Sequence, residues 1–147
     1  MKSMRQYALS IACLAPLLLC LTPLPSSAQE LKGLNENALF LQKEYKEGFD
    51  RIHAFIWVEW MGDESTQVSL LNKEVDALFS FLEGFEADYS REAFNAIIKW
   101  SHEDYEDDNK AFLRKMEYVN LENLLEIRAE WSMVLYDYNE QIEKKKP

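Results

Sequence analysis

Cysteine is nearly absent from this 147-residue chain, and both copies, Cys13 and Cys20, lie within its first 20 residues. The rest of the sequence therefore offers no disulfide, no thiol nucleophile, no c-type haem attachment motif and no paired-cysteine metal site. A domain without cross-links must be held together by the burial of apolar side chains. Glycine-rich phosphate loops, nucleophile elbows and metalloprotease motifs are also missing, so we expect no enzyme activity and no cofactor.

The N-terminus holds the longest apolar run of the chain. Lys2 and Arg5 precede an uncharged stretch over residues 7–24, which is followed by the letters "PLPSSAQE". A positive region, an apolar region and small residues before a cut are typical of a secretory signal peptide. The sequence therefore predicts a signal peptide over residues 1–28, which is cleaved off, and a single helical domain over residues 29–147.

A retained membrane anchor is the alternative interpretation of the same run. Pro16 interrupts the run, Pro23 and Pro25 end it, and its length is marginal against the roughly 20 apolar residues that cross a bilayer. We therefore expect an exported protein, periplasmic or secreted, without membrane contact after cleavage. The sequence leaves open whether the segment is cleaved or kept.

Basic residues are outnumbered in the mature chain. Removal of Lys2 and Arg5 leaves 14 basic residues against 26 acidic ones, a formal charge of about −12. Such a surface repels nucleic acid and anionic lipid, and it attracts a basic protein partner. Acidity that serves only solubility is an equally weighted alternative.

Glycine and proline are scarce in the mature chain, and apolar residues recur at the spacing of an α-helix. No alternation typical of a strand competes with this pattern. We predict an all-α protein, built as an antiparallel bundle of four or five helices with short connections. The apolar stripes of the predicted helices span residues 41–60, 68–85, 94–105, 112–119 and 121–142.

Few residues mark the ends of these helices. Gly84 marks the end of the second predicted helix, and Asp88 or Ser90 is the candidate N-cap of the third. The pattern does not decide whether Asn120 separates the last two stripes or lies inside one helix. The number of helices therefore stays open between four and five.

Histidine occurs twice, at His53 and His102. A di-iron bundle needs two Glu-x-x-His motifs, whereas Asp50 lies three residues before His53 and Lys99 three residues before His102. We therefore expect no metal site, and we interpret His53 as a half-buried residue bonded to Asp50. A metal- or small-ligand-binding bundle centred on Asp50, His53, His102 and Glu106 is the alternative class.

The acidic run "DYEDDNK" over residues 104–110 invites comparison with a calcium loop. An EF-hand loop starting at Asp104 would need glycine where Asn109 stands and glutamate where Lys115 stands, so this interpretation fails. The run suits the N-terminal end of a helix, where negative charge is favourable, and it can also attract a basic partner. We assign partner binding in this run to Asp104, Glu106, Asp107 and Asp108.

One charged residue interrupts an apolar stripe, because Arg128 lies between Leu124 and Leu135. A buried cation needs a carboxylate partner, since its desolvation is costly. We predict a structural ion pair between Arg128 and Glu59, with Asp76 as the second choice of partner. Alternatively, Arg128 lies at a groove and contacts a ligand or a partner protein.

Aromatic residues are abundant, and several of them lie off the main stripes. Trp57 shares a helix face with His53, and Trp100 lies beside the third stripe. Tryptophan is a frequent anchor of protein interfaces, so we assign partner binding to Trp57, His53 and Trp100. A wide core that buries these residues, and a homodimer that covers them, are the alternatives.

Export, acidity and off-stripe aromatic residues together favour a protein that acts by protein–protein binding. We expect an inhibitor or immunity-type protein directed against a basic toxin or hydrolase. A metal- or small-ligand-binding bundle and a periplasmic chaperone or adaptor are the alternatives. These classes share a helical architecture but no residue-level motif, so the identity of the partner stays open.

Overall fold

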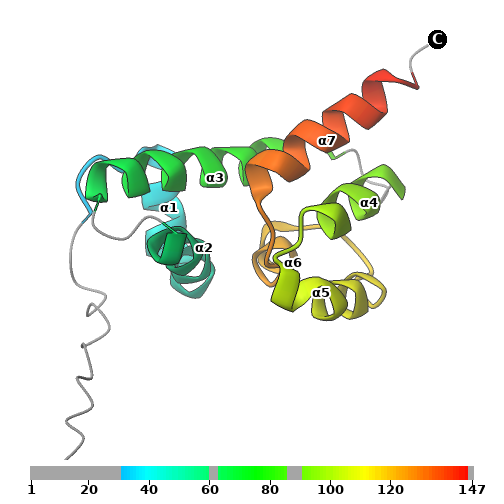
Figure 1. Ribbon diagram of the computed structural model, residues 1–147, viewed down its shortest axis with the longest axis horizontal. Helices are drawn as coiled ribbons and strands as arrows, with labels where there is room; N and C mark the ends of the chain where they lie inside the picture. The colour runs from blue at the N-terminus through cyan, green and yellow to red at the C-terminus, as the bar shows by residue number, and fades with distance from the viewer. Residues whose placement is uncertain (1–30, 60–62, 86–90, 146–147) are drawn as a thin grey trace, which may run out of the picture. The chain divides into compact units, whose positions relative to one another are not determined.

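The computed structural model describes residues 31–59, 63–85 and 91–145. Within them the chain forms helices and one isolated β-bridge, so the all-α prediction is confirmed (Figure 1). The predicted signal peptide lies outside the described residues. None of the described helices is both long and apolar enough to cross a bilayer. The helices are α1 (Glu36–Glu44), α2 (Lys46–Glu59), α3 (Glu64–Gly84), α4 (Arg91–Lys99), the 3-10 helix η1 (Glu103–Tyr105), α5 (Glu106–Leu113), α6 (Leu121–Leu125) and α7 (Trp131–Glu143).

Helix α3 is the element against which four of the other helices pack. Asp63 caps its beginning, because the Asp63 side chain accepts a hydrogen bond of 3.1 Å from the Thr66 N–H. The helix ends at Gly84, as the sequence predicted. Helices α1, α2, α6 and α7 all contact α3, and Figure 1 shows α3 running beside α1, α2 and α7.

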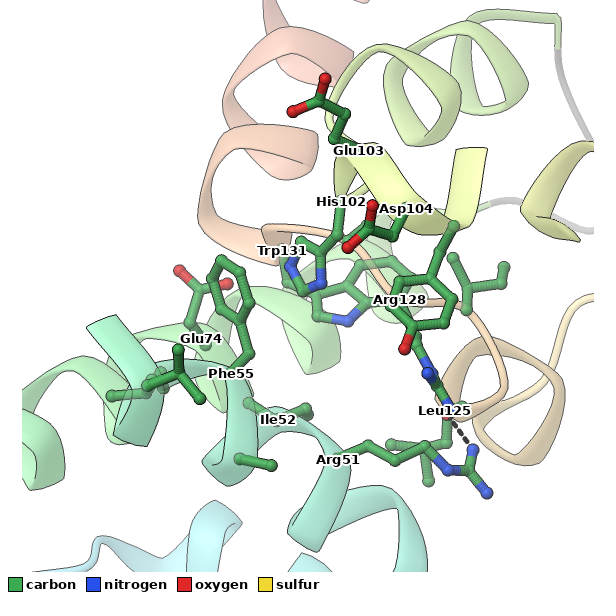
Figure 2. A pocket seen from close by; sticks show the side chains of 16 residues that line it. Arg51, Ile52, Phe55, Glu74, His102, Glu103, Asp104, Leu125, Arg128 and Trp131 are labelled. Carbon is green, nitrogen blue, oxygen red and sulfur yellow. Dashed lines mark hydrogen bonds between the residues drawn. The ribbon is translucent and has the colours of Figure 1, made fainter. Parts of the chain in front are cut away.

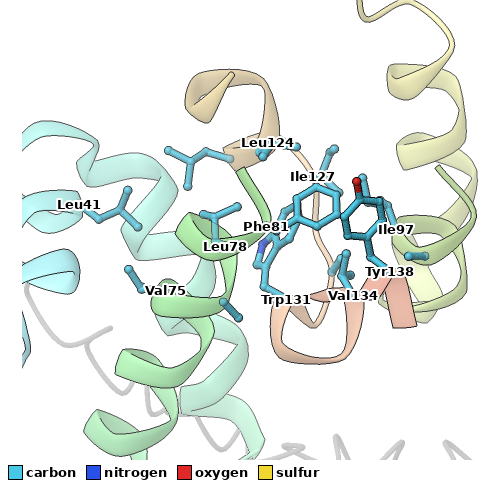
Figure 3. Packing of buried hydrophobic residues seen from close by; sticks show 14 of the residues in the cluster. Leu41, Val75, Leu78, Phe81, Ile97, Leu124, Ile127, Trp131, Val134 and Tyr138 are labelled. Carbon is cyan, nitrogen blue, oxygen red and sulfur yellow. The ribbon is translucent and has the colours of Figure 1, made fainter. Parts of the chain in front are cut away.

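The hydrophobic core is centred on the buried face of α3. Val75, Leu78 and Phe81 recur on this face at helical spacing and are buried (Figure 3). The Phe81 ring packs against Trp131 and Tyr138 of α7, with ring centroids 5.8 and 5.2 Å apart. Burial of each such side chain contributes about 1.5–3 kcal/mol to stability. The core therefore joins α3 to the C-terminal helix.

The first apolar stripe is divided between two helices. The prediction of one helix over residues 41–60 is wrong at Tyr45, whose φ of −134° and ψ of 52° lie outside the helical region. The Tyr45 N–H still donates to Leu41 O at 2.8 Å, and Tyr45 O accepts from Phe49 N–H at 3.0 Å. The change of direction lets both α1 and α2 pack against α3. The apolar spacing continues through the break, so the stripe does not reveal it.

The last stripe is divided as well. Asn120 caps α6, because its side chain accepts a hydrogen bond of 2.8 Å from the N–H three residues later. Asn120 therefore separates the last two stripes. Residues 126–130 connect α6 with α7, and Ala129 in this connection forms an antiparallel bridge with Ser101. The prediction of one helix over residues 121–142 is wrong, and the antiparallel four-helix arrangement is not confirmed.

The third stripe ends earlier than predicted. Helix α4 ends at Lys99, and Tyr105 lies in η1 rather than on the same helix. The pairing of Ser101 with Ala129 requires extended backbone, which ends the helix before its apolar spacing does. The candidate N-caps Asp88 and Ser90 lie outside the described residues.

Gly48 allows α2 and α6 to approach each other closely. A methyl group at Gly48 would lie 2.8 Å from both Cδ atoms of Leu125 and 3.0 Å from its Cβ atom. Leu125 is buried, so its side chain has little room to withdraw. A side chain at position 48 would therefore push the two helices apart or strain Leu125.

We expect Gly48→Ala to lower the free energy of unfolding by about 1 kcal/mol. Overpacking costs about 1–3 kcal/mol, which exceeds the gain of about 0.5–1 kcal/mol from replacing a helical glycine by alanine. Gly84→Ala is the matched control, because nothing lies within 4 Å of an added methyl group there, and it should not destabilise. Urea unfolding measures both variants, and equal midpoints would contradict the close approach.

Candidate functional site

A pocket of about 500 Å³ lies between α2, η1 and the connection from α6 to α7 (Figure 2). Its walls are mainly apolar. Ile52, Phe55 and Ile56 come from α2, whereas Ile127 and Trp131 come from the connection and the start of α7. The charged side chains that line the pocket are Arg51, Glu74, Glu103, Asp104 and Arg128. The pocket can therefore hold an apolar group and pair with a charge.

The non-helical wall of the pocket is held in place by Asn109, whose side chain is buried with 3% of its surface exposed. The Asn109 amide donates to Arg128 O and to Ser101 Oγ, each at 2.9 Å. Its oxygen accepts from the Arg128 N–H at 3.2 Å, and His102 N–H also donates to Arg128 O at 3.0 Å. These hydrogen bonds satisfy the N–H and carbonyl groups of Arg128, which are not part of a helix, and they fix the position of the Arg128 backbone.

His102 forms one of the aromatic walls. Its ring is stacked on Phe55 with centroids 3.6 Å apart and planes inclined by 14° (Figure 2). Burial lowers the pKa of His102 from 6.5 to about 4, and the positive charge of Arg128 contributes to the decrease. The buried Nε2 atom has no hydrogen-bond partner among the described residues. His102 is therefore neutral near pH 7.

Arg128 lies at the pocket wall rather than within a helix. Its guanidinium carbon lies 4.0 Å from the centre of the Tyr105 ring, and none of the ion pairs between described side chains involves Arg128. Asp76 is the wrong partner, because it accepts hydrogen bonds from two asparagines near the start of α1. The Glu59 side chain lies outside the described part of the chain, so the pair of Arg128 and Glu59 stays a prediction.

The other two buried or half-buried charges of the pocket have partners. Arg51 donates to Leu125 O at 2.5 Å and to the Glu126 carboxylate at 3.0 Å. Glu74 is buried and accepts a hydrogen bond of 3.2 Å from the Ser132 N–H, which satisfies a donor at the start of α7. These two charges have a structural role, which distinguishes them from Arg128.

The structure divides the acidic run into two groups. Asp104 and its neighbour Glu103 line the pocket and are exposed, so they form part of its rim. Figure 2 shows the Glu103 carboxylate pointing away from the aromatic side chains. Glu106, Asp107 and Asp108 lie in the first turn of α5 and are also exposed, but they do not line the pocket. Their charges suit the N-terminal end of a helix, as the sequence indicated.

The aromatic residues assigned to partner binding lie outside this pocket. His53 and Trp57 are half-buried on α2 with ring centroids 5.9 Å apart. The predicted bond from His53 to Asp50 is wrong, because Asp50 instead accepts a hydrogen bond of 2.5 Å from Lys46 one helical turn away. Burial lowers the pKa of His53, and the Asp50 charge opposes this effect. Trp100 is half-buried, with Lys99 Nζ 5.5 Å from the centre of its ring.

No group of three or more metal-ligating side chains forms within the described ranges. Phe55, Glu103 and Tyr105 are among the pocket residues that sequence reasoning missed as site residues. Phe55 carried a signal, since it lies off the apolar stripe of its helix. Tyr105 carried none, because its spacing placed it on the core stripe of the third predicted helix.

The chain matches no known family model, no curated protein and no solved structure. No relative therefore supplies a role for the pocket. Its function has to follow from its own chemistry, which combines an apolar cavity, an acidic rim and one cation without a described counter-charge.

We expect Asn109→Ala to lower the free energy of unfolding by about 2–4 kcal/mol, because it leaves the Arg128 N–H without a partner and removes one of the two hydrogen bonds to Arg128 O. The matched control is Asn37→Ala, which removes a single exposed hydrogen bond to Asp76 and should change stability by less than about 0.5 kcal/mol. Urea unfolding at neutral pH measures both variants. A small loss for Asn109→Ala would show that the wall does not depend on this side chain.

His102 should make stability depend on pH in a defined direction. Its pKa is about 4 in the folded chain and 6.5 when unperturbed. Between these values the unfolded state binds a proton that the folded state does not, so stability falls as the pH decreases from about 6.5 to about 4. His102→Gln should therefore lose less stability than the wild type between about pH 7 and pH 4.5. Equal losses in urea-unfolding midpoint would contradict the lowered pKa.

Proposed function

We propose that this protein is an exported binding protein that recognises a basic protein partner, as an inhibitor or immunity-type protein of a toxin or hydrolase does. The observation that carries the proposal is the acidic rim of Glu103 and Asp104 beside an apolar pocket. An apolar pocket bordered by charge is the usual form of an interface hot spot, where one anchoring side chain is fully desolvated. Export follows from the apolar N-terminal segment over residues 1–28.

The dimensions of the pocket support an anchoring role. A volume of about 500 Å³ is ample for one large apolar side chain and lies within the ~300–1,000 Å³ usual for ligand pockets. Val58 lies at the edge of the pocket with 73% of its surface exposed, which extends the apolar surface to the outside. Covering this surface would remove apolar area from water and so favour association.

The charge distribution supports a basic partner. Glu103 and Asp104 stand at the rim, and the three carboxylates of the first turn of α5 follow directly in the chain. Exposed charges of one sign speed up encounter with an oppositely charged protein and suppress encounter with acidic ones. In this proposal Asp104 pairs with the partner, while Glu106, Asp107 and Asp108 steer it.

A small apolar ligand is the second candidate, and the volume of the pocket favours it for the same reason. Such a ligand would bind in the cavity without contacting the carboxylates of the rim. The two candidates therefore differ in whether Glu103 and Asp104 contribute to affinity.

A peptide library displayed on phage, selected on the purified protein, tests the proposal. Enriched peptides should combine an aromatic or aliphatic residue with neighbouring lysine or arginine. For a peptide so selected, Glu103→Gln with Asp104→Asn should weaken binding about tenfold, because the pair of Asp104 with the peptide and the negative charge of the rim are lost. The control is Glu83→Gln with Glu143→Gln, an equal change in charge at exposed positions away from the pocket.

A pocket variant completes this experiment. Ala54 is exposed and lines the pocket, so Ala54→Phe should narrow it and weaken binding without unfolding the chain. Ala111→Phe on α5 is the matched control, since Ala111 is exposed and does not line the pocket. Selected peptides that lack basic residues, or that bind both double variants equally well, would overturn the proposed function.

A further inference from the structure

We propose that Arg128 makes this pocket a carboxylate-binding site, and that its occupant is the C-terminal end of a basic chain whose last residue is apolar. The inference deepens the proposed function, because it uses the same pocket and names the chemistry of the anchoring group. It rests on four features of the pocket: a guanidinium group beside Tyr105, the balance of charge, a neutral histidine and an acidic rim.

The first feature is the position of the guanidinium group. Its carbon lies 4.0 Å from the centre of the Tyr105 ring, and its N–H groups lie in the guanidinium plane. A carboxylate is the partner that matches this fork with two parallel hydrogen bonds. Asn109 and His102 hold the Arg128 backbone on both its N–H and its carbonyl side, so little freedom is lost when a ligand binds. A ligand carboxylate would take the place that the sequence suggested for Glu59.

The second feature is the balance of charge inside the pocket. Arg51 is already paired with Glu126 and bonded to Leu125 O, and Glu74 already accepts from Ser132. Arg128 is therefore the lining cation that forms no ion pair with a described side chain, although the buried carboxyl of Glu74 lines the same pocket. An apolar pocket that holds such a cation favours an anion that brings its own apolar body.

The third feature is His102, which lines the same pocket and is stacked on Phe55. A neutral imidazole adds no second positive charge to the pocket, and its buried Nε2 atom has no hydrogen-bond partner among the described residues. The stacked rings also extend the apolar surface against which the body of the ligand packs.

The acidic rim selects between two sources of such a carboxylate. A small apolar acid has no group that compensates Glu103 and Asp104, which repel its charge. A chain that ends in an apolar residue preceded by lysine or arginine presents the carboxylate to Arg128 and the cations to the rim. Charge complementarity along the pocket therefore favours the C-terminus of a basic chain.

Calorimetric titration of the full-length protein with two matched peptides tests the inference. The probe is the peptide Lys-Lys-Ser-Phe with a free carboxylate, and its control is the same peptide with a C-terminal amide. We expect the acid to bind at least about tenfold more tightly than the amide, because a charge-assisted pair with Arg128 is lost in the amide. Arg128→Gln should remove this preference, and Arg128→Lys should retain part of it.

Two controls guard against effects of folding. Arg114→Gln removes one exposed cation at the C-cap of α5 that does not line the pocket, and it should keep the preference for the acid. The nitrogen-15 NMR signal of the Arg128 guanidinium provides a readout within the wild-type protein. It should shift on addition of the acid and not on addition of the amide.

The outcomes separate this inference from the proposed function. Equal binding of acid and amide would overturn the carboxylate site and leave binding of a basic chain intact. Binding of phenylbutyrate but not of phenylbutanol or of either peptide would support the carboxylate site, while overturning both its peptide occupant and the proposed function. Absence of binding for all four probes at millimolar concentration would overturn the inference.

Discussion

The three hydrogen bonds of the Asn109 side chain hold together the two non-helical segments on which the pocket depends. Ser101 and His102 on one segment meet Arg128 and Ala129 on the other, and neither segment has a helical ladder to satisfy its backbone groups. The buried Asn109 amide supplies hydrogen bonds to these segments that a helical ladder would otherwise provide. The positions of His102 and Arg128, and hence the chemistry of the pocket, follow from this constraint.

The charges around the pocket fall into distinct roles. Arg51 and Glu74 satisfy backbone groups at the ends of α6 and α7, so their presence is explained by the fold. The Arg128 guanidinium carbon lies 4.0 Å from the centre of the Tyr105 ring and Arg128 forms no ion pair with a described side chain, while His102 remains neutral through burial and through the field of Arg128. The pocket thus holds a cation and a neutral histidine, together with the buried carboxyl of Glu74 and the two exposed carboxylates of the rim.

Helical periodicity predicted the all-α class but not the bounds of the helices, and the predicted helix over residues 112–119 is wrong because α5 ends at Leu113. Tyr45 divides a stripe whose apolar spacing is uninterrupted, because α1 and α2 each need a different direction to pack against α3. Ala129 leaves the helical conformation because it pairs with Ser101. The break at Tyr45 and the non-helical conformation of Ala129 both depend on contacts between residues distant in sequence, which apolar periodicity does not reveal.

The amino-acid sequence by itself determined the all-α class, the acidic charge and the lack of any thiol after Cys20, since these depend on composition and local spacing. It also singled out Arg128 as a charge that needs an explanation. Only the tertiary structure decided that Phe55, His102 and Arg128 share one pocket and that His53 and Trp57 lie outside it. The pocket lies where α2, η1 and the connection from α6 to α7 come together. No local sequence pattern predicts this arrangement, because the relative placement of these elements depends on how the core orients α3 and α7.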